Sequence, residues 1–196
     1  DLEAAGMPDD FWNYGEPYAS YPIETARLKR VLNMAADGAG WGRELPAGEG
    51  IGLAVHRSFV TYVGTAVRVR VGEDGIVRVP EVHMAVDCGF PVHPERIRSQ
   101  MEGACVMGMT LAANSAITYA NGRVEQNNFN DYDVARIDNY PELVVTHIVP
   151  HDFETHAAGV GEPGVPPFAP ALYNAVFNAT GKRLRDLPLP RNLADI

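Results

Sequence analysis

Residues 159–164, Gly-Val-Gly-Glu-Pro-Gly, present one carboxylate, Glu162, on a short glycine- and proline-rich loop. Glycine lets a backbone approach a bulky ligand closely, and proline stiffens the chain, so the loop can hold this carboxylate in a fixed direction. A carboxylate held in this way is a candidate general base. The alternative is a structural role, in which Glu162 caps the helix that we expect to follow.

The same loop contains the spacing G-x-G-x-x-G. A dinucleotide-binding fingerprint needs a strand directly before the glycines and a helix that opens within them. Here the preceding residues 151–156 are polar, and Pro163 and Pro166 interrupt the start of a helix. The sequence therefore argues against a nucleotide site.

Two other polar groups are candidates for binding. Gln100, Glu102 and Gly103 lie in a segment with helical spacing, where a buried amide must find a partner. Gln100 is then either a hydrogen-bonding partner of a cofactor ring, or a member of a structural network or of a solvent-facing side of the helix. The run from Asn127 to Tyr132 either lines a pocket or forms an Asn-rich turn.

A fourth group combines side chains that bind metals, namely His151, Asp152, Glu154 and His156. Their spacing is not that of a helical zinc motif, and Pro150 disfavours a helix. A small metal-dependent hydrolase is one interpretation, and a solvated polar loop is the more common one.

Composition excludes several classes of protein. The 196 residues carry a formal net charge of −9, which argues against a nucleic-acid partner. An iron–sulfur cluster needs about four thiolates, and this chain has two cysteines. No apolar run reaches the roughly 18 residues of a membrane span. The chain starts at Asp1 without a signal-peptide pattern, so we expect it to be part of a larger assembly.

Hydrophobic periodicity predicts the elements that position these groups. Three helices are expected, the second of them central and buried, over residues 22–36, 94–115 and 167–180. Gly38 and Gly40 are expected to end the first helix and Gly181 to cap the third. Valine-rich segments predict an antiparallel meander and one later strand, at 52–59, 60–71, 75–86 and 142–149. Asn121-Gly122 predicts a hairpin. The class is therefore α+β, with a mixed or antiparallel sheet packed against a few helices.

We divide the chain into an extended aromatic arm at 1–21 and one domain at 22–196. The arm shows neither helical nor strand periodicity, and its aromatic residues are Phe11, Trp12, Tyr14, Tyr18 and Tyr21. It either packs against another body or is a disordered terminus.

Several separated motifs resemble the molybdenum hydroxylases of the xanthine oxidase family. Residues 87–103 (DCGFPVHPERIRSQMEG) resemble the family segment D-C-G-x-x-V-N-P-x-x-v-x-x-Q-x-E-G, and residues 159–163 resemble its G-V-G-E-P active-site loop. Residues 124–132 and 179–189 are similar to the isoquinoline 1-oxidoreductase-like branch. The motifs occur in the family's order.

This resemblance implies the C-terminal molybdopterin-binding part of a catalytic subunit. The family hydroxylates an aldehyde or an N-heterocycle with oxygen from water, at a molybdenum–molybdopterin centre that in bacteria is usually in the cytosine dinucleotide form. By match of motif, Glu162 would be the general base, Gln100 the partner of the cofactor ring, and Val160 and Gly161 cofactor contacts.

The implied partners are the N-terminal remainder of the molybdenum subunit and an iron–sulfur subunit or domain with two [2Fe–2S] clusters. The compartment, cytoplasm or periplasm, is left open. His93 replaces the family's asparagine before proline, and the upstream segments that complete the pocket are not found in this sequence. The alternative function is a catalytically silent relative that serves in assembly or partner binding.

Overall fold

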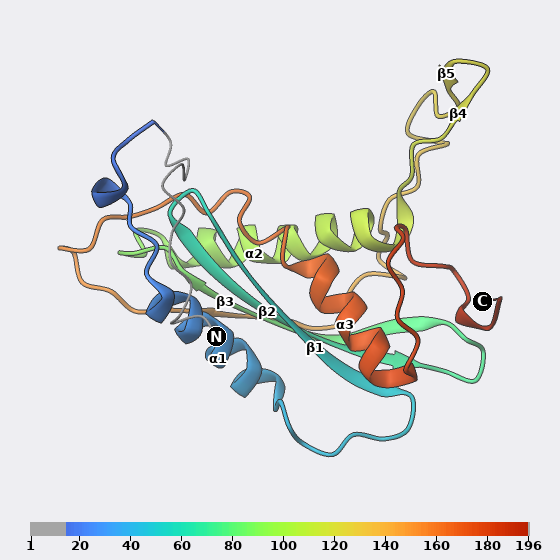
Figure 1. The fold of residues 1–196 in the computed structure, drawn as a ribbon, viewed down its shortest axis with the longest axis horizontal. Coiled ribbons are helices and arrows are strands. Elements are labelled where there is room, and N and C mark those ends of the chain that lie inside the picture. The colour runs from blue at the N-terminus through green and yellow to red at the C-terminus, as the bar shows by residue number, and fades with distance from the viewer. Residues whose placement is uncertain (1–14, 196) are drawn as a thin grey trace.

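A computed structural model describes residues 15–195, and the residues of the expected arm up to Tyr14 lie outside this part. Its main body is a sheet with one helix on one face and two helices on the other (Figure 1). The elements are α1 (Thr25–Ala39), β1 (Glu49–Ser58), β2 (Thr61–Val71), β3 (Val77–Asp87), α2 (Pro94–Met109), β4 (Tyr119–Ala120), β5 (Arg123–Val124), β6 (Val144–Ile148) and α3 (Phe168–Thr180). The α+β class is confirmed.

The main sheet has the strand order β1-β2-β3-β6. The first three strands form the expected antiparallel meander, with Ser58 opposite Thr61 at the first turn. β6 pairs with β3 in parallel, from Val82 opposite Val144 to Val86 opposite Ile148. A parallel neighbour requires a long crossover, which α2 and the segment after it supply. The sheet is therefore mixed.

β2 is covered on both faces, so nearly all of it is buried. Tyr62 and Ala66 join the core beneath α1, whereas Val63 and Val67 join the larger core beneath α2 and α3. Successive side chains of β2 point to opposite faces of the sheet, so one strand contributes to both cores.

β1 also needs a residue without a side chain where α3 crosses it. A Cβ on Gly52 would collide with the backbone of α3 at Ala171.

α1 begins three residues later than its sequence pattern predicts. The hydroxyl of Tyr62 donates to the carbonyl of Pro22 at 3.2 Å and accepts from the amide of Glu24 at 3.0 Å. These bonds hold the chain before Thr25 outside the helix. The helix ends at Gly40, whose φ of 68° is left-handed. Gly38, expected at the helix end, therefore lies inside α1.

α2 starts at Pro94 as predicted, and its last turns widen into a π-helical turn at Thr110–Asn114. One stripe of the helix is buried, including Met101 and Cys105. The expectation of a central, buried helix holds for this stripe and not for the outer face, because Met107 is 49% exposed and a Cβ on Gly103 would have no neighbour within 4 Å. The segment from Ala135 to Val144 lines an open groove beside that face without filling it.

The predicted hairpin at Asn121-Gly122 is confirmed. The φ angles of Asn121 and Gly122 are 53° and 75°, as a type I′ turn requires. β4 and β5 form a separate two-stranded ribbon that stands away from the body in Figure 1.

The described part of the arm contains a 3-10 turn at Tyr18–Ser20, so it is not fully extended. α3 and its glycine cap, Gly181, match the prediction.

Candidate active site

The glycine-rich loop is bound to three elements of the domain. The Ala158 amide donates to the carbonyl of Cys88 at 2.8 Å, just after β3, and the Gly159 amide donates to the carbonyl of Phe59 at 3.2 Å. Further along, a Cβ on the buried Gly164 would lie 2.7 Å from the Cβ of Ala104 on α2. Backbone bonds and tight packing therefore hold the loop on both sides of Glu162.

The turn between β1 and β2 supports this loop in an unusual conformation. Phe59 and Val60 have φ angles of 50° and 62°. The left-handed region is unfavourable for a β-branched residue such as valine, and such strain persists only where the surroundings enforce it. A Cβ on Gly159 would lie 3.0 Å from the Cβ of Phe59, so the strained turn and the loop are in direct contact.

Gln100 and Gly161, which are far apart in sequence, lie side by side. A Cβ on Gly161 would be 3.6 Å from Nε2 of Gln100 and would meet no other atom within 4 Å. Both residues are exposed. Within residues 15–195 the Gln100 amide forms no hydrogen bond, so its donor and acceptor are open to a ligand. Val160 packs against the larger core and fixes the loop from beneath.

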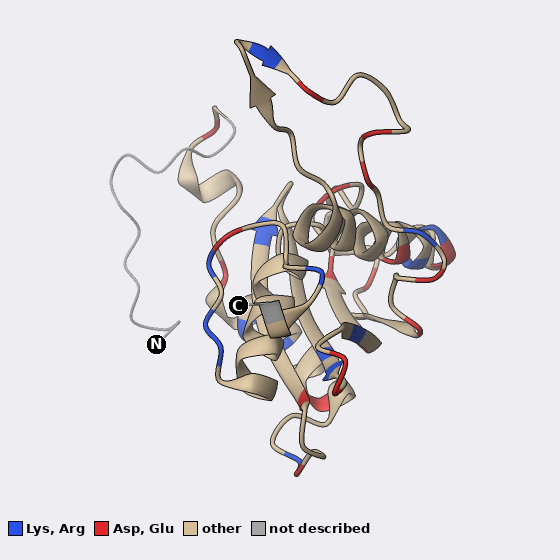
Figure 2. Ribbon diagram, turned by 90° about the vertical axis from the view of Figure 1, so that its right-hand side faces the viewer, with Lys and Arg blue, Asp and Glu red and all other residues tan. Residues whose placement is uncertain are grey.

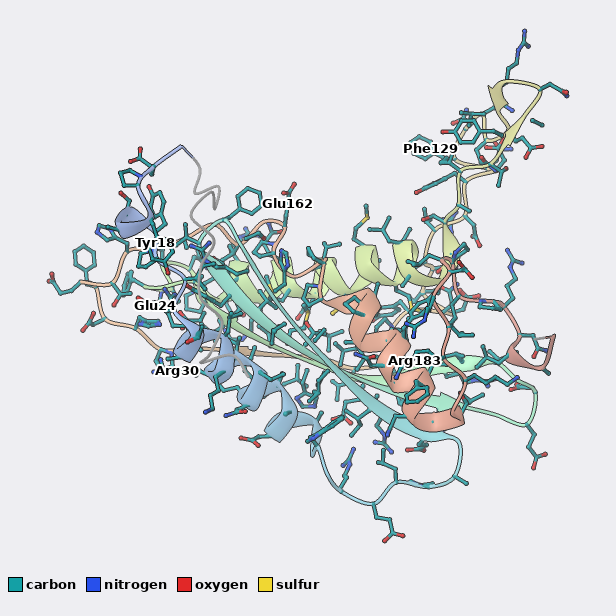
Figure 3. The ribbon with its side chains drawn as sticks, viewed as in Figure 1. Tyr18, Glu24, Arg30, Phe129, Glu162 and Arg183 are labelled. Atoms are coloured by element: carbon teal, nitrogen blue, oxygen red, sulfur yellow. The ribbon has the colours of Figure 1, made fainter. Side chains whose placement is uncertain are left out.

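Glu162 is exposed and projects outward from the loop above the N-terminal half of α2 (Figure 3). Its carbonyl accepts a hydrogen bond from the Val165 amide at 2.9 Å. α3 has Pro167 at its N-cap position and no side-chain cap. The alternative that Glu162 caps this helix is therefore wrong. Within residues 15–195 its carboxylate has no hydrogen-bond or ion-pair partner.

Three features would suit contact with the edge of a large organic cofactor. They are the amide of Gln100, which has no hydrogen-bond partner in the described residues, the glycine backbone at Gly161, and the exposed carboxylate of Glu162. No group of three or more His, Cys, Asp or Glu side chains in the described residues is placed to hold a metal ion.

The His151–His156 group is not assembled into a site. Nε2 of His151 lies 2.8 Å from Oδ1 of Asp87, and the hydroxyl of Thr155 donates to the Asp152 carboxylate at 3.1 Å. Glu154 and His156 are exposed. The metal-dependent hydrolase therefore finds no support in the structure.

The Asn-rich run forms a turn, as one of the two interpretations predicts. The amides of Asn127 and Asn128 both donate to the Asp131 carboxylate at 2.8 Å. These backbone bonds lower the pKa of Asp131. Figure 3 shows Phe129 of the same run on the extension that stands away from the body, apart from Glu162 above α2. The run is therefore not part of the candidate site.

Sequence reasoning missed a buried ion network beside the loop. Asp87, the last residue of β3, has a fully buried side chain that binds Arg27 of α1 and His151. Burial disfavours its charge, but the hydrogen bond and charge of Arg27 and the charge of His151 outweigh burial and lower the pKa of Asp87. The sequence could have indicated Asp87 as a polar residue at the end of a predicted strand. It could not indicate Arg27 and His151 as its partners, because only the tertiary fold brings them together.

The outer face of α2 continues from Gln100 into an open groove of about 650 Å³. Its lining includes Ser99 and Gly103 of the helix and Ile137, which is 92% exposed. Figure 2 shows acidic and basic residues interspersed along the ribbon of the described chain. The surface around the candidate site is thus open and partly apolar.

A family model described as a molybdopterin cofactor-binding domain matches residues 27–141, more than half of the chain. The chain belongs to this family. The resemblance to the xanthine oxidase family is thereby confirmed, and the domain's Gln100 lies within the matched region. Within the described residues, no helix is both long enough and apolar enough to cross a bilayer.

Two curated relatives agree with this assignment. The beta subunit of isoquinoline 1-oxidoreductase from Brevundimonas diminuta is 30% identical over 172 residues, which cover 85% of this chain and 21% of that protein. A membrane-bound aldehyde dehydrogenase of Gluconacetobacter polyoxogenes is 30% identical over 169 residues, covering 83% and 22%. This chain thus spans about a fifth of the length of these two relatives.

Solved structures show the same fold. The aldehyde oxidoreductase from Desulfovibrio gigas has a TM-score of 0.57 and 22% identity, over 65% of this chain and 14% of that one. Reconstituted CO dehydrogenase from Oligotropha carboxidovorans has a TM-score of 0.56 and 21% identity, over 67% and 17%. The fold of this domain therefore occurs within much longer proteins.

Proposed function

We propose that the chain is the C-terminal portion of a molybdenum hydroxylase catalytic subunit that oxidises an aldehyde or an N-heterocycle. The observation that carries this proposal is the placement of Glu162, Gly161 and Gln100 on one open surface of a molybdopterin cofactor-binding domain. The printed names of the relatives, an isoquinoline oxidoreductase and an aldehyde dehydrogenase, support these two substrate classes.

In this proposal Gln100 and Gly161 bind the cofactor and Glu162 accepts a proton. The Gln100 amide binds the edge of the pterin, and Gly161 permits its close approach, because no Cβ stands between the backbone and the cofactor. Val160 keeps this part of the loop seated on the core. The cofactor, when bound, supplies a metal centre that acidifies a water molecule and accepts two electrons. Glu162 takes and holds the proton on its carboxylate.

We place the rest of the cofactor site, the substrate pocket and the electron carriers on other parts of the enzyme. The N-terminal part of the subunit would complete the pterin site and the substrate pocket. The cofactor is proposed in its cytosine dinucleotide form. Two [2Fe–2S] clusters on an iron–sulfur subunit or domain are proposed to carry the electrons away, because a cluster needs about four thiolates and this chain has two cysteines, both buried.

The test is Glu162→Gln in the complete molybdenum subunit with its partner chains. Loss of the base should lower kcat/KM by roughly 10²–10⁴-fold, with molybdenum content unchanged. Glu154→Gln is the matched control, because Glu154 is an exposed carboxylate of the same segment, and it should retain activity. Full activity of Glu162→Gln would contradict the proposal. An assembly that contains neither molybdenum nor pterin would favour a catalytically silent relative.

A further inference from the structure

Asp87 is a fully buried carboxylate at the point where β3, α1 and the loop segment meet. Its Oδ1 lies 2.6 Å from Nη2 of Arg27, and its Oδ2 lies 3.0 Å from Nε of the same guanidinium. The second partner residue is His151, whose Nε2 is 2.8 Å from Oδ1, and the Gly89 amide donates to the same oxygen at 3.4 Å. The pairing with Arg27 is bidentate, which fixes direction as well as distance.

Each partner of Asp87 is itself held in place. The guanidinium of Arg27 lies 4.5 Å from the centre of the Tyr62 ring, and Tyr62 is fully buried. The hydroxyl of Tyr62 in turn binds the chain just before α1. Asp87 therefore belongs to a rigid unit formed by α1 and the sheet.

His151 connects this rigid unit to the loop that carries Glu162. It lies shortly after β6, at the start of the segment that runs to the loop. From there the chain follows the residues after β3: Phe90 donates to the carbonyl of Thr155 at 3.2 Å, and Ala158 donates to that of Cys88 at 2.8 Å. The bond between His151 and Asp87 thus fixes the start of a segment whose end presents Glu162.

We propose that Asp87 is a positioning residue for the proposed reaction, acting through His151 to hold the loop with Glu162 in its working direction. This inference rests on the proposed function. The Asp87 side chain is fully buried, so its effect is on geometry rather than on a molecule at the surface. A displacement of about 1 Å at a reacting group can cost on the order of 100-fold in rate, so the anchoring bond matters although it is remote.

The test replaces His151, which is less buried than Asp87, in the complete subunit with its partner chains. His151→Leu removes the donor and keeps an apolar side chain of similar bulk. His151→Gln keeps an N–H donor near the position of Nε2. Asp87→Asn is the companion variant on the other side of the bond. Asp74→Asn is the matched control, because it breaks an exposed Asp–Arg pair with Arg78 at 2.7 Å in a distant turn.

The first measurement is amide hydrogen exchange of the peptide containing Ala158 and Gly159, which needs no turnover. We expect exchange about tenfold faster in His151→Leu and Asp87→Asn, near wild-type exchange in His151→Gln, and no change in Asp74→Asn. The second is kcat per bound molybdenum, expected to fall on the order of 10- to 100-fold in His151→Leu with KM little changed, and to recover in His151→Gln.

The positioning role is overturned if His151→Leu matches the wild type in exchange and in kcat per molybdenum, or if His151→Gln is as impaired as His151→Leu. Failure of the proposed function gives a different result, namely full turnover by Glu162→Gln. The exchange measurement still decides the role of Asp87 in that case, because it reports the loop and not the reaction.

Discussion

Nδ1 of His83 on β3 and Nε2 of His147 on β6 are 2.9 Å apart, directly beneath Gly38 of α1. The two rings are stacked, with centroids 5.2 Å apart and an interplanar angle of 14°. Nε2 of His83 also lies 2.7 Å from Glu81. One hydrogen bond therefore joins the two parallel strands at the edge of the α1 core, in a site that leaves no room for another atom.

Gly38→Ala tests this close approach. A Cβ at position 38 would lie 2.6 Å from Nδ1 of His83 and 2.7 Å from Nε2 of His147, so the paired rings must shift. We expect the free energy of unfolding to fall by about 1–3 kcal/mol in denaturant titrations. The control is Gly103→Ala on α2, where the Cβ meets open space and alanine is expected to add up to about 1 kcal/mol. Equal effects of the two variants would contradict the prediction.

The histidine pair also predicts how stability depends on pH. Burial and the charge of His83 lower the pKa of His147 from its usual 6.5. The unfolded chain then binds more protons than the folded one below this value, so the free energy of unfolding should fall as pH falls through about 6.5. In His147→Gln this slope should be shallower.

The measurement is urea unfolding of wild type and His147→Gln at a series of pH values from about 7.5 to 5.5. His156→Gln is the control, because His156 is exposed, and it should keep the wild-type slope. Burial also lowers the pKa of His56, so part of the slope should persist in every variant. Identical slopes for His147→Gln and wild type would show that the pair does not titrate in this way.

Gly161→Ala separates folding from cofactor binding. The added Cβ would make ordinary contact with Gln100 at 3.6 Å, so stability should stay within about 0.5 kcal/mol of wild type. The same methyl group would stand on the surface proposed for the pterin. Molybdenum and pterin content of the purified complex should therefore fall. A fully loaded Gly161→Ala complex would place the cofactor elsewhere.

Both cysteines should be unreactive in the folded protein. Burial, together with the nearby charge of Asp87 at Cys88 and of Glu102 at Cys105, raises the pKa of each thiol. The thiolate is the reactive form, so a thiol reagent should label neither residue under native conditions and both after denaturation. Rapid labelling of Cys88 in the native state would mean that the end of β3 opens readily.

Local patterns predicted the elements well because each depends on neighbouring residues. Valine alternation located the meander, and Gly181 marked the end of α3. Asn121-Gly122 specified its turn through the left-handed conformation that these residues tolerate. The start of α1 was missed because it is set by the hydroxyl of Tyr62, which comes from another element.

Sequence motifs predicted individual residues of the candidate site but not how these residues are arranged in space. Glu162 and Gln100 were each identified from their own motifs, but their relation through Gly161 required the fold. The bonds of Asp87 to Arg27 and His151 join three segments whose spacing carries no signal in one sequence. Likewise, the parallel pairing of β6 with β3 depends on a crossover that hydrophobic periodicity does not describe.

The parallel pairing of β3 and β6 has a consequence for how the protein is made. β1, β2 and β3 pair through short turns and can assemble as soon as they leave the ribosome. The partner edge of β3 stays open until Ile148 has been synthesised, after α2 and the β4–β5 hairpin. During that interval a valine-rich edge is a template for aggregation, so nascent chains stalled before β6 should be the ones that chaperones capture.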